Sequence, residues 1–202
     1  MNRAVTSIII PVALFVFLIA GSSHAQSVNP ITNCTTISQP GSYAVANNIT
    51  ATAANLNFLP GSGQAGCIVI TANFVTLNLG GFTIDGSGLG STSASGVIGV
   101  GSGMYVQSGT VAKFTSRGVW LNGYGNTVEH IRSFSNAGDG IVLQRPGGHA
   151  IANTSVFNGG NGLSVFCPGV VVENAANSNT GTQIFESTVF GTCTSAENNP
   201  AP

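Results

Sequence analysis

The residues that could perform acid–base chemistry are few, and five of them lie between positions 130 and 149. This stretch carries two imidazoles, two guanidinium groups and one carboxylate, and side chains of these types can transfer protons in catalysis. Arg145, His149 and Asp139 are the candidate catalytic residues. Asp139 could instead have a structural role. Arg117 lies 22 residues earlier, which is the length of an internal repeat described below, and this spacing predicts a salt bridge between the two residues.

A second candidate is a set of residues at intervals of 22 positions that includes carboxylates. We call this set a column, because the repeat predicts that its members stack on one another. Its charged members are two repeats apart, which corresponds to about 10 Å between stacked strands. That distance is too long for two carboxylates to share a calcium ion, whose ligands lie at about 2.3–2.6 Å. We therefore interpret the column as a solvated polar face and predict no metal site. Its members are Asp85, Gln107, Glu129, Ile151 and Glu173.

A third candidate is a partly apolar stripe that should face outward, with Trp120 as its largest member. An apolar surface on the outside of a protein needs a function or a cover. Trp120 could stack on a sugar, with Asn122 and Gln144 as hydrogen-bonding neighbours, and these three are the candidate ligand-binding residues. Alternatively, a loop over residues 50–66 or 86–95 covers the stripe, or the stripe is a protein–protein interface. Of these interpretations we favour the covering loop.

The composition indicates which elements position these residues. Asp, Glu, Lys and Arg make up 5% of the 202 residues, against about 25% in an average soluble domain. Five basic residues are too few for a phosphate-neutralising surface, so no nucleic-acid partner is expected. The 43% hydrophobic content argues against disorder, and 28 glycines and 20 asparagines favour an all-β chain with many turns.

Residues 1–25 have the pattern of a secretory signal peptide. Arg3 precedes an apolar run from Ile8 to Ala20, and Ser23-His24-Ala25 fits a small-x-small cleavage site. The run is shorter than the ~20 residues that span a bilayer, so a membrane anchor is disfavoured and no span is predicted in the mature chain. The sequence predicts export by a bacterial-style route, to the periplasm or the extracellular space.

Four cysteines remain in the mature chain, and an oxidising compartment allows two disulfides with three connectivities. The cysteines fall into an N-terminal and a C-terminal pair, and we favour pairing within each. A metal site is disfavoured because no Cys-x-x-Cys motif or neighbouring histidine occurs. The predicted bridges are Cys34–Cys67 and Cys167–Cys193.

An internal repeat of 22 residues dominates the sequence. Steps of this length give two columns in which every member is apolar. A glycine precedes most members of the first column, and Asn136 and Asn158 form a turn pair at the same spacing. The first column is Val75, Val97, Val119, Ile141, Leu163 and Phe185, and the second is Ile84, Val106, Val128, Ala150 and Val172.

Such a repeat predicts a coil that adds one rung every 22 residues, each rung holding about three short strands. Equivalent strands stack in parallel at about 4.8 Å, and alternate residues point inward. Val119 and Leu121 should therefore face the core, and Trp120 and Asn122 should face outward. Glycine and asparagine suit the corners, and stacked Asn amides can hydrogen-bond along a ladder.

The segment Cys34–Tyr43 and the block Val75–Gly86 resemble secreted right-handed parallel β-helix proteins. The turns Asn136–Ile141 and Asn158–Leu163 are similar to rungs of the pectin-lyase-like superfamily, and the resemblance covers about residues 30–192. It implies the fold, whereas the superfamily includes polysaccharide lyases, hydrolases and epimerases as well as binding and structural members. In its lyases an Arg or Lys base works with Ca²⁺ held by Asp residues, so Ca²⁺ enters here only under a lyase alternative.

The sequence as a whole predicts one right-handed parallel β-helix domain over residues 26–193 and a flexible tail over residues 194–202. We expect a secreted, non-catalytic module without a cofactor that contacts polysaccharide or a cell-envelope component. The segment around Arg145 does not match the lyase motifs, and Ala150 follows His149 where the hydrolases have Gly-His-Gly. The alternatives are a small polysaccharide lyase or related carbohydrate-active enzyme, and a purely structural surface protein.

Overall fold

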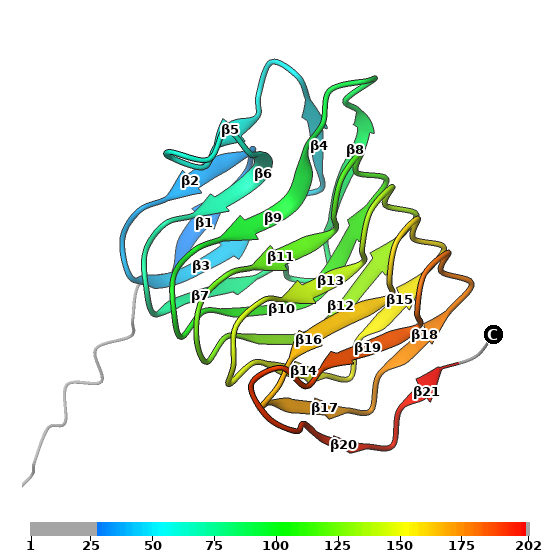
Figure 1. Ribbon diagram of the computed structural model, residues 1–202. Coiled ribbons are helices and arrows are strands. Elements are labelled where there is room, and N and C mark those ends of the chain that lie inside the picture. Colours follow the sequence, from blue (N-terminus) through cyan, green and yellow to red (C-terminus); the bar gives the residue numbers. More distant parts are fainter. Residues whose placement is uncertain (1–27, 201–202) are drawn as a thin grey trace, which may run out of the picture.

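The computed structural model describes residues 28–200, and the predicted signal peptide lies outside them. Every regular element in these residues is a β-strand, and the strands stack along one axis from the N-terminal to the C-terminal end (Figure 1). The chain winds as the predicted right-handed parallel β-helix, with parallel pairing throughout except between β5 and β6. No helix in this part of the chain could cross a membrane.

One face of the solenoid is an eight-stranded sheet that contains the strand of Trp120. Its strands are β2 (Thr35–Ile37), β5 (Asn57–Phe58), β6 (Ala65–Ile70), β9 (Ser95–Gly99), β11 (Val119–Leu121), β13 (Ile141–Leu143), β16 (Leu163–Phe166) and β19 (Ile184–Ser187).

The other two faces form one thirteen-stranded sheet with two rows, because β10 and β12 bend across the corner and belong to both rows. The first row holds β1 (Asn29–Ile31), β3 (Gly41–Val45), β7 (Val75–Asn78), β10 (Tyr105–Ala112), β12 (Thr127–Phe134), β14 (His149–Ile151), β17 (Val170–Val172) and β20 (Thr194–Ala196). The second row adds β4 (Ile49–Thr52), β8 (Thr83–Gly88), β15 (Thr154–Val156), β18 (Ala175–Asn177) and β21 (Asn199–Pro200).

The pairing register confirms the 22-residue rung in the middle of the chain and corrects its ends. Val119 pairs with Val97 and Ile141, as the first column predicted. Val75 does not belong to this column, because it lies in β7 on another face and pairs with Gly41. At the other end Leu163 pairs with Ile184 rather than Phe185, since the last rung is one residue shorter.

The second column shows the same pattern of agreement and error. Val106 pairs with Val128, and Val128 pairs with Ala150, as predicted. Ile84 pairs instead with Val111, and Ala150 pairs with Val171 rather than Val172. The insertion over residues 86–95 lengthens one rung and moves Ile84 out of the column. Register is therefore set by the hydrophobic face of each strand and not by a constant period.

Alternate residues of the inner strands build a single elongated core. Val119 and Leu121 are fully buried in it, as their alternation with Trp120 predicted. The glycines that precede the inward column are required by close packing between rungs. A Cβ atom on Gly140 would collide with the Ser155 hydroxyl and with the carbonyl oxygen of Gly162. A larger residue there would push neighbouring rungs apart.

Toward the C-terminal end of the solenoid, two corners of a rung use a left-handed residue followed by a buried asparagine. Phe157 has φ of 57°, and the next residue is Asn158. The Asn158 Oδ1 atom accepts hydrogen bonds from the backbone N–H and from the side-chain amide of Asn136, both at 3.0 Å. Its own amide donates to Asn179 at 2.9 Å. The predicted asparagine ladder is thus present, and Asn153 and Asn174 belong to a second one.

Disulfides and additional strand pairs stabilise the two ends of the solenoid. Both predicted bridges form, and each joins successive rungs, Cys34–Cys67 at the N-terminal end and Cys167–Cys193 at the C-terminal end. Residues 194–200, which belong to the predicted tail, contain β20 and β21, and these strands pair with β17 and β18. These residues continue the solenoid, and Asn198 accepts the amide of Asn174 as the next step of the ladder.

Replacing one ladder residue tests how much the corners contribute to stability. Asn158→Ala leaves the buried backbone N–H of Asn136 without its acceptor and removes one hydrogen bond from the side-chain amide of Asn136 and one from that of Asn179. We expect the free energy of unfolding, measured by urea titration, to fall by about 3 kcal/mol. The control is Asn177→Ala on the outer surface of β18, with an expected change within about 0.5 kcal/mol. Equal losses in the two variants would contradict a stabilising role of the ladder.

Candidate functional site

The outward stripe on the eight-stranded sheet is covered at one end by the β5–β6 hairpin. Leu59, at the start of the hairpin turn, packs with Val69, Ile98 and Trp120 in a cluster separate from the main core. The covering loop that the sequence favoured over residues 50–66 is confirmed for this part of the stripe. Trp120 is 7% exposed as a result of this packing.

Polar groups hold the Trp120 ring in place. Its Nε1–H donates to Gln144 Oε1 at 2.6 Å, and the Arg117 guanidinium lies 5.5 Å from the ring centroid. An aromatic ring attracts a cation over its face, so this contact stabilises both side chains. Trp120 faces outward, as predicted, but neighbours that the 22-residue repeat did not place cover most of its ring, and its role in ligand binding stays a prediction.

Beside Trp120 the surface is hollowed by an open cavity of about 240 Å³. Its floor contains Trp120 and Val142, and Phe185 on its wall is 41% exposed. Guanidinium, carboxylate, amide and hydroxyl groups surround this apolar floor. The lining residues are Arg117, Trp120, Asp139, Val142, Gln144, Asn161, Ser164, Phe166 and Phe185.

The rim residues are held by bonds along the rungs. Asp139 Oδ1 accepts the backbone N–H of Asn161 at 2.7 Å, and Asn161 Oδ1 accepts that of Thr182 at 2.8 Å. The salt bridge predicted between Arg117 and Asp139 does not form, because the ion pairs of residues 28–200 are Lys113–Asp85 and His130–Glu129. Both side chains line the cavity, and Arg117 is held by Trp120 instead.

Arg117 also lines a second cavity of about 270 Å³. This cavity lies toward the N-terminal end of the solenoid, between the tip of the β5–β6 hairpin and the segment before β9. Its walls include Gln64, Ser93 and Ser116, so it is polar. The guanidinium therefore stands at the junction of two hollows that follow the axis of the solenoid.

The three candidate catalytic residues do not come together. Asp139 precedes β13 and Arg145 follows it, so the two lie at opposite ends of that strand. Arg145 is exposed and donates through Nε to Asn122 Oδ1 at 3.0 Å, away from the cavity lining. His149 is exposed at the start of β14 in the other sheet. The structure therefore does not gather these three residues into one cluster, because a strand and a corner separate them.

The acidic column keeps its middle members and loses both ends, since Val172 and not Glu173 pairs with Ile151. Glu129 stacks on Gln107 and Ile151, but Asp85 pairs with Ala112 on another face. Lys113 Nζ lies 3.3 Å from Asp85 Oδ2. Burial raises the pKa of the Asp85 carboxyl, but hydrogen bonds from Ser87 and Lys113 outweigh this effect and leave the pKa below its ordinary value.

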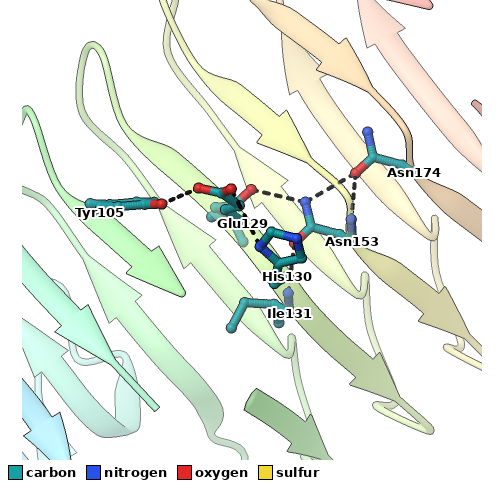
Figure 2. Close-up of polar contacts among 7 residues, drawn as sticks. Tyr105, Glu129, His130, Ile131, Asn153 and Asn174 are labelled. Carbon is teal, nitrogen blue, oxygen red and sulfur yellow. Dashed lines mark hydrogen bonds and ion pairs between the residues drawn. The ribbon is translucent and has the colours of Figure 1, made fainter. Parts of the chain in front are cut away.

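A small polar cluster surrounds Glu129 where β12 turns the corner (Figure 2). The Tyr105 hydroxyl donates to Glu129 Oε2, and His130 Nδ1 lies 3.3 Å from Glu129 Oε1. The hydrogen bond to Glu129 raises the pKa of Tyr105 to about 12. Because Tyr105 stays protonated, it serves as a hydrogen-bond donor and not as a base.

The metal-binding capacity of residues 28–200 is limited to one group of potential ligands. Cys167, Cys193 and Glu186 have ligand atoms within 4.8 Å of one another. The two sulfur atoms are joined in a disulfide, and a metal requires thiolates. This group therefore holds the last rung together and is not a metal centre in the oxidised protein.

Arg117, Phe166 and Phe185 were not among the candidate ligand-binding residues. A constant 22-residue period places Phe185 in the inward column, whereas the shorter last rung turns it outward. The 22-residue spacing predicted a salt bridge between Arg117 and Asp139, so Arg117 was not considered for ligand binding. A signal was present in the sequence, because Arg117 and Trp120 are three residues apart across a glycine corner.

Comparison with known proteins supports the fold and leaves the function open. No protein-family model and no curated protein matches the sequence. The crystal structure of pectate lyase Pel9A superposes with a TM-score of 0.53 at 16% identity, over 77% of this chain and 44% of that chain. The chain thus spans less than half the length of that lyase.

The Azotobacter vinelandii mannuronan C-5 epimerase AlgE6 A-module gives a TM-score of 0.40 at 11% identity, over 87% of this chain and 67% of that chain. The parallel β-helix fold that the sequence predicted is confirmed by the strand pairing and by the superposition on the lyase.

Tyrosine ionisation tests the polar cluster around Glu129. A pKa of about 12 lies above the ordinary 10.0, so the bond contributes stability below pH 10 and this contribution is lost as the pH rises toward 12. We expect Glu129→Gln to lower the pKa of Tyr105 toward 10.0, measured from tyrosinate absorbance. Tyr105→Phe should remove the late step from the titration curve. An unchanged curve in Glu129→Gln would contradict the assignment.

Proposed function

We propose that this protein is a secreted, non-catalytic β-helix module that binds polysaccharide in the cavity on its eight-stranded sheet. The observation that carries the proposal is the guanidinium of Arg117, which is held over Trp120 at the edge of a cavity with an apolar floor and a polar rim. Sites for small ligands combine an apolar lining with a few placed polar groups in this way. A sugar has hydroxyls for the rim and C–H faces for the floor.

The charge of Arg117 favours a sugar that carries an acidic group. Its guanidinium has no carboxylate partner among residues 28–200. Guanidinium groups bind carboxylates with two parallel hydrogen bonds, which adds geometric specificity. Asp139, Gln144 and Asn161 supply acceptors and donors for the hydroxyl groups. The second cavity beyond Arg117 gives room for a further sugar unit along the same axis.

Binding fits the cavity better than hydrolysis or elimination does. Glycoside hydrolysis uses two carboxylates about 5–10 Å apart, and Asp139 is the sole carboxylate in the lining of this cavity. Asp139 accepts a backbone hydrogen bond that holds it in place. The basic residues that the sequence offered for proton transfer, Arg145 and His149, do not line the cavity. These placements support a module that holds its ligand unchanged.

Secretion is supported by the sequence and by the covalent structure. The N-terminal 25 residues have the signal-peptide pattern, and all four cysteines are paired in disulfides. Disulfides persist in oxidising compartments such as the periplasm and the extracellular space. An extracellular or periplasmic polysaccharide is therefore the class of partner that the protein meets.

Removing the charge of Arg117 tests the proposed site. We expect Arg117→Gln to weaken binding of a soluble polyuronate by about tenfold, measured by isothermal titration calorimetry, because a charge-assisted hydrogen bond contributes roughly 1.5–3 kcal/mol. Arg145→Gln is the matched control, since Arg145 is exposed and does not line the cavity. Equal affinity of the Arg117→Gln variant and the wild type, or an equal loss in the control, would refute the site.

An elimination assay tests the non-catalytic part of the proposal. With polyuronate as substrate we expect no unsaturated product, whether Ca²⁺ is added or removed with a chelator. The readout is the ultraviolet absorbance of the product. Ca²⁺-dependent turnover that disappears in Arg145→Ala would overturn the non-catalytic assignment and favour a small polysaccharide lyase.

A further inference from the structure

A pair of aromatic side chains lies on the outer surface of the second strand row, away from the cavity lining. Phe134 ends β12, and Phe157 follows β15 in the next rung. Their ring centroids are 5.8 Å apart with the ring planes at 89°, an edge-to-face pair. Phe157 is 58% exposed, so most of its ring is open to solvent. Phe134 is partly buried, so Phe157 presents the open ring of the pair.

The third member of the group is a guanidinium. Arg132 Cζ lies 4.7 Å from the centroid of Phe134, and Arg132 is exposed. The ion pairs within residues 28–200 do not include Arg132. Thr154 is the register partner of Arg132 and is exposed beside it. An unpaired cation, a hydroxyl and an open ring thus lie on two adjacent rungs.

The fold does not require an aromatic residue at position 157. Phe157 occupies the left-handed corner position with φ of 57°, where a bulky side chain is disfavoured. The same corner in the other rungs is made by Lys113, Ser135 and Ser178. The hydrogen bonds of this corner come from the following residue, Asn158. A serine would therefore satisfy the backbone, and Phe157 is left for contact with something outside the chain.

We propose that Arg132, Phe134 and Phe157 form a second binding surface for an anionic polysaccharide. The inference takes its ligand class from the proposed function and adds a separate site for it. The open face of Phe157 suits the C–H face of a sugar ring, and Arg132 suits a carboxylate or sulfate on the same or the next unit. Two sites on one rigid solenoid let a single molecule bridge two polysaccharide chains.

The stoichiometry of binding tests the second surface. With a trimer of a uronic acid as the probe, calorimetry should give two equivalents bound per wild-type chain and one in Phe157→Ser. Arg132→Gln should weaken the second equivalent by about tenfold. Phe74→Ser is the matched control, because Phe74 is also exposed and left-handed, with φ of 55°, but lacks a guanidinium on its ring. It should keep both equivalents.

The outcomes separate this inference from the proposed function. One equivalent that survives Phe157→Ser and is lost in Arg117→Gln would overturn the second surface and leave the cavity site standing. One equivalent that survives Arg117→Gln and is lost in Phe157→Ser would overturn the cavity site and leave the second surface standing. No binding in the wild type would overturn both. Turbidity with long polyuronate should appear with the wild type and with Phe74→Ser, and each single-site variant should abolish it.

Sulfated dextran and neutral dextran identify the chemistry that the second surface recognises. Binding of the sulfated polymer that is lost in Arg132→Gln supports recognition of an anionic group. Binding of neutral dextran with the same affinity as polyuronate would overturn the anionic assignment, since Arg132 would then contribute nothing. Thermal unfolding of Phe157→Ser should match the wild type, which separates a binding effect from a folding defect.

Discussion

Each buried asparagine of the two ladders is bonded at the same time to its own rung and to the next one. Asn158 accepts two hydrogen bonds from Asn136 and donates one to Asn179, and all three side chains are buried. A buried amide that loses a partner costs about 1–3 kcal/mol, so the ladder fixes the spacing of successive corners. The left-handed residue before each asparagine is strained on its own and is held by these bonds. From Asn136 onward, rung spacing and corner geometry therefore follow from one repeated interaction.

The same ladder positions the cavity. Asp139 comes three residues after Asn136, and Asn161 comes three residues after Asn158, so each corner delivers one polar rim residue to the edge of the eight-stranded sheet. The Asp139 carboxylate then accepts the backbone N–H of Asn161, which repeats the ladder pattern on the outside of the corner. The strands that follow supply Val142 and Ser164 to the cavity lining. The site is precise because it is built on rungs that cannot slide past one another.

The sequence was sufficient for the features that repeat and insufficient for those that break the repeat. The fold, the rung length, the asparagine turns and both disulfides follow from spacing and resemblance, and the structure contains all of them. Phe185 and Ile84 were misplaced because one shorter rung and one insertion change the register by amounts that a fixed period does not contain. A shift of one residue exchanges the inner and outer faces of a strand, which is how Phe185 became part of the cavity. Trp120 shares an outer apolar cluster with Leu59, a residue far from it in sequence that the 22-residue repeat does not place there.

Because the chain has few charged residues, few ion pairs form, and Arg117 and Arg132 have no carboxylate partner in residues 28–200. A solenoid held together by backbone and asparagine hydrogen bonds needs no ion pairs to join its rungs, and Lys113–Asp85 and His130–Glu129 are the ones present in residues 28–200. Exposed pairs of this kind contribute about 0–1 kcal/mol. Arg117 and Arg132 take part in neither, and each is held instead over an aromatic ring, Trp120 and Phe134. A cation placed on a ring keeps its hydrogen-bond donors free, because the ring satisfies the charge without occupying the N–H groups. Both arginines therefore remain able to bind an anion from outside the chain.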